Sequence, residues 1–179
     1  MHIRPLEVDD YPATLDLLVA TFAPLFEDYV RPLLGAQVFD HQHGHWEQDY
    51  RDVLPTLHVP ESGRHAAVAH PADGAIAGLV SWRFDDRPHH GEISLLAVSP
   101  LHGRRHIGRR LCEHAIHHLR AGGVDVVQIA TGGDPFHAPA RALYESLGLT
   151  RVPTAVYLGS IRTEVAGTSH PAPGAIRGC

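Results

Sequence analysis

The order of apolar and polar residues near the N-terminus predicts a strand followed by a helix. MHIRPLEV, residues 1–8, alternates apolar and polar side chains in the way a half-buried strand does. Residues 9–26 are then largely apolar, and the helical stretch contains Leu15, Leu17, Leu18, Val19 and Phe22. From Pro24 to Pro60 the pattern is irregular, and we expect one further amphipathic helix there, at about 45–54.

The middle of the chain predicts three antiparallel strands. They are HAAVAH, AIAGLVSWRF and GEISLLAV, separated by a PADG turn and by the polar loop DDRPHH. The apolar spacing then becomes helical in IGRRLCEHAIHHLRAGG, residues 107–123, which two glycines close. VDVVQIA predicts a buried strand, APARALYESLG a helix that stops at Gly148, and LTRVPTAVYLGSI, residues 149–161, a final strand or bent pair of strands.

This order of elements predicts an α/β (α+β) sandwich, in which helices flank a mixed, mostly antiparallel central sheet. A chain of 179 residues is long enough for one sizeable core, so we expect a single domain over residues 1–162. Residues 163–179 are small, polar and proline-bearing, and we expect a flexible C-terminal tail there.

Composition narrows the class of protein. The chain is 44% hydrophobic and 20% charged, and it contains no apolar run long enough to span a bilayer. Its N-terminus lacks the apolar core of a secretory signal, and Cys112 and Cys179 form neither a disulfide framework nor a paired metal motif. We therefore expect a cytoplasmic protein without a membrane partner. The formal net charge of -5 argues against general binding to nucleic acid.

The stretch SPLHGRRHIGRRL, residues 99–111, connects a predicted strand to a helix that we expect to begin near Arg104. The first backbone N–H groups of a helix have no intrahelical acceptor, so a helix start of this kind can bind anions. The arginines of the stretch add Coulomb attraction for a polyphosphate. An ordinary connection with a solvated basic first turn is the alternative, and the net charge disfavours a DNA-recognition helix.

Two segments of this region resemble the GNAT superfamily of acetyl-coenzyme A-dependent N-acetyltransferases. EISLLAVSPLHGRRHIGRRLCEHAIHHL is similar to the family's acetyl-CoA-binding motif, and the matching residues are Val98, Pro100, Ile107, Gly108 and Leu111. HAPARALYESLGL is similar to a later helix of the family, and the matching residues are Ala140, Leu143, Tyr144 and Gly148. The chain departs from the family pattern at Gly103, His106, His137 and Leu149.

The resemblance implies that acetyl-CoA is the co-substrate. In the family, the pantetheine arm lies along one strand like an extra strand, which places it here on the backbone of Leu96, Ala97 and Val98. The pyrophosphate would lie on the loop and the first helical turn, at Gly103, Arg104, Arg105, His106, Ile107, Gly108 and Arg109. His106 carries a Cβ where the family has glycine, which restricts how closely the backbone approaches phosphate. His137, in place of the family's asparagine, and Tyr144 would contact the cofactor as well.

Glu92 and Tyr144 are the catalytic residues that the resemblance implies. An alkylamine with a pKa near 10 is mostly protonated at pH 7, and removing that proton costs about 4 kcal/mol. Glu92 would accept the proton through water, although a solvent-facing strand carboxylate is an equal alternative. Tyr144 would protonate the departing thiolate, a role typically worth about 10²–10⁴ in rate. Alternatively, Tyr144 is only packed on the apolar face of its helix, beside Leu143 and Leu147.

We expect the acceptor to be a small cationic molecule with a primary amine. Acidic residues outnumber basic ones in 24–57, where this family builds its acceptor site; they are Glu27, Asp28, Asp40, Glu47, Asp49 and Asp52. The series His41, His43 and His45 lacks a partner fixed by spacing, so we expect no metal site. The resemblance is compatible with a homodimer. A non-catalytic acyl-CoA-binding or regulatory module on the same fold stays the main alternative function, and a nucleic-acid binder with steep salt dependence is the second.

Overall fold

A computed structural model describes residues 1–71, 74–103 and 105–161, so Arg104 and the expected tail at 163–179 lie outside it. The chain forms a 5-stranded sheet in the order β1-β2-β3-β4-β5. The strands are β1 (His2–Pro5), β2 (Arg64–His70), β3 (Gly78–Phe84), β4 (His90–Val98) and β5 (Val126–Ile129). The first four strands pair antiparallel, and β5 pairs parallel with β4. The mixed, mostly antiparallel sheet predicted from the sequence is confirmed.

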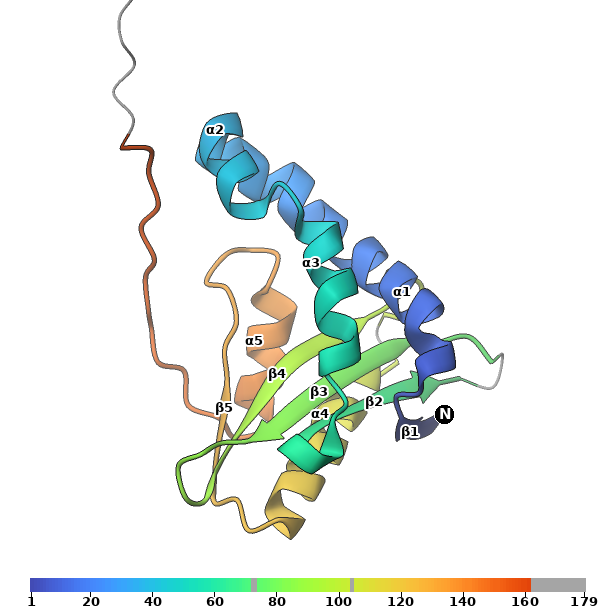
Figure 1. The fold of residues 1–179 in the computed structure, drawn as a ribbon. Coiled ribbons are helices and arrows are strands. Elements are labelled where there is room, and N and C mark those ends of the chain that lie inside the picture. The colour runs from blue at the N-terminus through green and yellow to red at the C-terminus, as the bar shows by residue number, and fades with distance from the viewer. Residues whose placement is uncertain (72–73, 104, 162–179) are drawn as a thin grey trace, which may run out of the picture.

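Helices cover both faces of this sheet (Figure 1). They are α1 (Tyr11–Ala23), α2 (Arg31–His43), α3 (Trp46–Val53), α4 (Ile107–Ala121) and α5 (Ala138–Ser146). Val68 and Leu79 on one sheet face pack with residues of α1, α2 and α3, whereas Val80 and Ile93 on the other face pack with α4. The helices in the described ranges are all too short or too polar to cross a membrane.

The expectation of an irregular region from 24 to 60 is wrong. A π-helix at Pro24–Val30 joins α1 to α2, so the chain is helical from Tyr11 to His43 except at Gly35, where φ is 72° and ψ is 158°. Pro24 and Pro32 are the first and second residues of their helical segments, positions at which proline is tolerated better than in a helix interior. They interrupt the sequence pattern without ending the helical path. The helix expected at about 45–54 is confirmed as α3.

The final strand expected at 149–161 is also wrong. These residues have no regular secondary structure, and 151–161 are exposed throughout. Figure 1 shows the segment leaving the sheet next to β5 and running towards the level of α2. A strand needs a neighbour for its backbone N–H groups, and here none of the described strands pairs with it. Pro153, which has no N–H, further disfavours a ladder.

Histidines surround Trp82 on the α4 side of the sheet. The ring of His65 stacks on Trp82 with centroids 5.6 Å apart, and His118 on α4 lies 5.4 Å from Trp82. His114, one turn earlier, lies 4.5 Å from His118. Burial, together with the neighbouring histidines, lowers the pKa of His65 and of His114 below the usual value. The folded protein therefore binds protons at these rings less tightly than the unfolded chain does.

Lowering the pH should destabilise the protein through this cluster. The folded-state pKa values lie below the unfolded ones. The contribution of these rings to the free energy of unfolding is therefore fully present above the unfolded pKa of about 6.5, and it is lost as the pH falls below that value. Urea unfolding at about pH 7.5 and about pH 5.5 measures this loss, and the loss should shrink in the His65→Gln variant. His41→Gln, on the exposed surface of α2, is the matched control. An equal pH dependence in the two variants would contradict the assignment.

Candidate active site

β4 and β5 pair along only the first part of β4. The last pair in the register is Ile93 with Ile129, whereas β4 continues to Val98, and Figure 1 shows the two strands diverging. The backbone N–H of Ser99 points towards β3 and donates to the carbonyl of Ala77, the residue before that strand, at 2.9 Å. Because backbone direction alternates along a strand, the N–H and C=O groups of Leu96 and Val98 face away from β3, towards the gap. Ala97, between them, is buried in the core.

The loop after β4 leads to the uncapped start of α4. A short helical turn at Pro100–His102 precedes Gly103, whose φ of -56° any residue can adopt. α4 begins at Ile107 rather than near Arg104, and His106 is its N-cap in a left-handed conformation, with φ 56° and ψ 18°. The side chain of His106 makes no capping hydrogen bond. The first N–H groups of α4 therefore have no acceptor within the helix, which is the arrangement that binds anions.

Close packing holds this helix start against β4 and α5. A Cβ at Gly108 would lie 3.3 Å from Leu143 Cδ2 on α5 and 3.5 Å from Val98 Cγ2 on β4. Ile107, the first residue of α4, is only 3% exposed and belongs to the core. The helix start, the open edge of β4 and the middle of α5 therefore meet at one place.

The arginines of this stretch point in different directions. Arg109 Nη2 donates to Ser146 Oγ at 2.7 Å and Nη1 to Glu113 Oε1 at 3.2 Å, so this side chain joins α4 to α5. Arg110 reaches the carbonyl of Met1 at 3.5 Å. Arg105 is exposed and forms no hydrogen bond with a described residue. Among the described arginines of residues 99–111, Arg105 is thus the one whose guanidinium is open to an anion.

Tyr144 is half-buried on α5, next to the Leu143 that packs on Gly108. Burial and the nearby Cys112 raise the pKa of Tyr144 to about 12. Burial also raises the pKa of Cys112 to about 12. At neutral pH Tyr144 therefore remains a phenol that can donate a hydrogen bond, and Cys112 remains a thiol.

His137, the N-cap of α5, is fixed by Asp134. Asp134 Oδ2 lies 2.7 Å from His137 Nδ1, and Asp134 Oδ1 accepts the backbone N–H of His137 at 3.0 Å. Burial acts to raise the pKa of Asp134, but the hydrogen bonds from His137 outweigh it and hold the pKa below its usual range. Arg141 Nη1 donates to the carbonyls of Gly132 and Asp134 at 2.6 and 2.7 Å, which closes the loop before α5.

Glu92 lies in an open groove on the sheet face towards α3. Its Oε2 accepts from Arg83 Nε at 3.0 Å and from Arg83 Nη2 at 2.6 Å, while its Oε1 has no partner among the described residues. The groove has a volume of about 310 Å³ and is lined by Val53, Thr56, Leu57, Arg64, Ser81, Trp82, Arg83, Glu92 and Ser94. Because Glu92 and Ser94 flank Ile93, where pairing with β5 ends, the groove reaches the point at which the strands diverge.

The acidic residues of 24–57 are not part of this groove. Glu27 Oε2 binds Arg31 Nε at 2.7 Å and its Oε1 accepts from Trp46 Nε1 at 2.9 Å, while Asp40 binds the same arginine at 2.9 Å. None of the six acidic residues singled out from the sequence lines the groove, whereas Arg64 and Arg83 do. The groove therefore carries more positive than negative side chains.

Of the series His41, His43 and His45, His43 packs against aromatic side chains. The ring of His43 lies 5.3 Å from Phe26 and 5.7 Å from Phe39. Across the described ranges, no group of three or more His, Cys, Asp or Glu residues is placed to hold a metal ion.

Sequence reasoning missed Arg64, Ser81, Arg83 and Asp134. The register places Arg83 directly opposite Glu92 and Arg64 directly opposite Arg83. A cross-strand pair of opposite charge next to the loop DDRPHH was therefore a usable signal. Ser81 and Asp134 leave no signal in the sequence, because their surroundings depend on how strands and loops pack.

Replacing His106 by glycine should stabilise the protein. The left-handed conformation costs a residue with a Cβ about 1–2 kcal/mol, and glycine adopts it freely. The greater freedom of glycine in the unfolded chain offsets about 0.4–1 kcal/mol of this gain. Urea unfolding of His106→Gly should show a higher free energy of unfolding than that of His106→Ala, which keeps the Cβ. Equal stability of the two variants would show that the conformation is unstrained.

Comparisons with known proteins agree with this architecture. A curated relative, mycothiol acetyltransferase from Beutenbergia cavernae, is 41% identical over 80 residues, which are 45% of this chain and 26% of that protein. The chain thus covers about a quarter of the length of this relative. Among solved structures, a tetramutant of a Bacillus halodurans protein matches with a TM-score of 0.69 and 20% identity, over 89% of this chain and 100% of the other.

Another solved structure, an aminoglycoside antibiotic 6′-N-acetyltransferase from Acinetobacter haemolyticus, matches with a TM-score of 0.59 and 15% identity, over 91% of this chain and 100% of the other. At these identities the two structures support the fold alone. Residues 22–149 match the acetyltransferase (GNAT) family, which confirms the resemblance stated from the sequence. Because this match spans more than half of the chain, the protein belongs to the acetyltransferase (GNAT) family.

Proposed function

We propose that the protein transfers an acetyl group from acetyl-CoA to a primary amine, by direct attack of the amine in a ternary complex. The observation that carries this proposal is the end of β4–β5 pairing at Ile93, beside the uncapped start of α4. An open strand edge suits an extended arm that contains amide groups, and a helix start suits phosphate. Coenzyme A has both, and its thioester supplies the activated acyl group.

The residues proposed to hold the cofactor follow this geometry. Backbone groups at Leu96 and Val98, on either side of Ala97, would pair with the pantetheine arm. Backbone N–H groups from Gly103 to Arg109 would face the pyrophosphate, and the free Arg105 guanidinium would add charge-assisted contacts. Arg104 belongs to the same proposal but lies outside the described residues. At the start of α5, His137 would contact the cofactor, with its ring held by Asp134.

Glu92 is the proposed acceptor of the amine proton. Arg83 fixes one carboxylate oxygen of Glu92, which leaves the other to receive a hydrogen bond from the amine or from a water molecule between them. The groove that contains Glu92 ends where β4 and β5 diverge, so an amine in the groove would approach the thioester from the side of the α3 face. No covalent intermediate with the enzyme is needed on this route.

Tyr144 is the proposed donor to the departing thiolate. Its raised pKa of about 12 keeps the proton on the phenol at neutral pH. The phenol thus donates a hydrogen bond as negative charge develops on sulfur, which stabilises the transition state more than the ground state. The thiolate then takes a proton from Tyr144, which regains one from solvent.

The expected cationic small molecule rests on the acidic residues of 24–57, which lie outside the groove. The homodimer and the cytoplasmic location stay predictions from the sequence. If the protein binds coenzyme A but releases no thiol with any amine, the non-catalytic acyl-CoA-binding module is the better description.

Calorimetric titration with coenzyme A should show saturable binding. Arg105→Gln should weaken it several-fold, because a charged phosphate contact is lost, and Arg51→Gln on α3 is the matched control without effect. His106→Gly should tighten binding, because the backbone can then approach phosphate more closely. Weaker binding by His106→Gly would instead make the His106 ring a contact. Absence of binding at high micromolar coenzyme A would refute the proposal.

Tyr144→Phe should lower kcat by about 10²–10⁴ and leave the KM for acetyl-CoA nearly unchanged. The substitution removes only the hydroxyl from a half-buried ring, so the packing of α5 is kept. Tyr157→Phe is the matched control, because the Tyr157 side chain is 93% exposed. Thiol release with a panel of amines measures both variants. An unchanged kcat in Tyr144→Phe would show that this tyrosine is only packed.

A further inference from the structure

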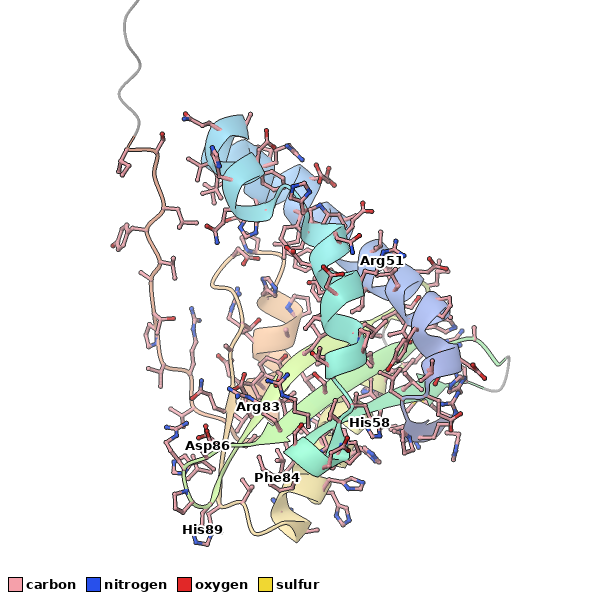
Figure 2. The ribbon with its side chains drawn as sticks, viewed as in Figure 1. Arg51, His58, Arg83, Phe84, Asp86 and His89 are labelled. Carbon is pink, nitrogen blue, oxygen red and sulfur yellow. The ribbon has the colours of Figure 1, made fainter. Side chains whose placement is uncertain are left out.

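A row of charged side chains crosses the sheet at the floor of the groove. Arg64 on β2 lies directly opposite Arg83 on β3, and Arg83 lies directly opposite Glu92 on β4. Directly opposite residues of antiparallel strands share a sheet face, so the three side chains lie on the face towards α3. Figure 2 labels Arg83 on this face.

The row contains two guanidinium groups for one carboxylate. Glu92 is bound by Arg83 through two hydrogen bonds, whereas Arg64 forms no ion pair with any described carboxylate. Two like charges directly opposite each other on neighbouring strands repel. An anion between Arg64 and Arg83 would convert this repulsion into two attractions.

Other acidic residues near Arg83 do not fill this role. Asp85 is held by the guanidinium of Arg87 at 2.9 Å and by the backbone N–H of Arg87 at 2.9 Å. The negative charge of Asp86 attracts Arg83 from the hairpin end of the strands. Neither Asp85 nor Asp86 lines the groove. The side of Arg83 that faces Arg64 is therefore left to a ligand.

A buried hydroxyl group in the same groove points to a bound molecule independently. Ser81 is 2% exposed and lines the groove, yet its Oγ has no hydrogen-bond partner among the residues that the structure describes. Buried polar atoms are almost always paired, because leaving one unpaired costs free energy. Ser81 lies two residues before Arg83 on β3, hence on the same face. A polar ligand in the groove would satisfy this hydroxyl and the arginines together.

We infer that the acceptor carries an anionic group, a carboxylate or a phosphate, which binds between Arg64 and Arg83 while its amine lies at Glu92. The inference rests on the proposed function, since it takes Glu92 to mark the amine's position. Neighbouring strands lie about 4.8 Å apart, so the amine and the anion are separated by about 5–10 Å. The acceptor is then an amino acid or phosphorylated amine with its charges several bonds apart, rather than a polyamine.

Matched acceptors test this charge preference by thiol release. For the carboxylate, the series is 6-aminohexanoate, its neutral amide and 1,6-diaminohexane; for the phosphate, the pair is O-phosphoethanolamine and ethanolamine. We expect the anionic member of one series to exceed its matched partners in kcat/KM by about tenfold or more. The series with the larger ratio identifies the anion. Equal rates, or a preference for the diamine, would overturn the inference while leaving acetyl transfer to amines intact.

Arg64→Gln tests the site itself. The anionic-to-neutral ratio of kcat/KM should fall towards one in Arg64→Gln and stay unchanged in Arg51→Gln, whose side chain lies outside the groove. A ratio is measured within one preparation, so a partial loss of folded protein cancels. A ratio unaffected by Arg64→Gln would overturn the inference.

A binding measurement covers the case in which none of these amines is turned over. With coenzyme A at saturation, so that its phosphate site is filled, calorimetric titration with inorganic phosphate and with 6-aminohexanoate should show saturable millimolar binding of at least one. Arg64→Gln should abolish it. No binding of either probe would refute the anion site, whereas failure of the coenzyme A titration itself would refute the proposed function instead.

Discussion

α4 lies so close to β3 that the strand has room only for a glycine at position 78. A Cβ there would lie 2.8 Å from Leu111 Cδ1 and 3.0 Å from the carbonyl oxygen of Ala97, closer than packed side chains allow. At Gly108 the same helix packs against α5 and β4, and an added Cβ would lie 3.3 Å from a methyl group of Leu143. These two contacts hold the first turn of α4 beside the open edge of β4. The proposed cofactor site and the placement of Tyr144 depend on them.

The fold could be predicted where the sequence period reflects local burial. α4 buries one face, α5 has a half-buried apolar face, and β2 and β3 are short, largely buried apolar runs, so these elements were visible in the sequence. The helical path from Tyr11 to His43 was missed because Pro24, Pro32 and Gly35 look like breaks, although the prolines sit where a helix tolerates them. The strand predicted at 149–161 was wrong because the sequence pattern suggested an element that the fold does not form. Its residues suit a strand, but a strand also requires a partner that local sequence does not provide.

The candidate site was predictable to the extent that it is contiguous in sequence. Residues 96–109 form one strand edge and one helix start, so a motif could locate them. The directions of the arginine side chains could not be predicted. Arg109 turns to Ser146 on α5, because a long flexible side chain takes the partner that tertiary packing offers. The groove was missed for a related reason. Its floor joins three strands, and the extra residue Ser94 shifts the register between Ser81 and Trp82.

The burial of Cys112 has a practical consequence for following catalysis. Only the thiolate form of a cysteine reacts readily with thiol reagents. Cys112 lies on the buried face of α4, and with a pKa of about 12 it supplies almost no thiolate at neutral pH. Each proposed turnover releases one new thiol into solution. In a Cys179→Ser variant, which removes the second cysteine of the chain, a colorimetric reagent therefore counts turnovers without interference from Cys112 while the protein is folded. A slow signal from Cys112 would instead report α4 lifting from the sheet, so one reagent separates chemistry from local unfolding by rate.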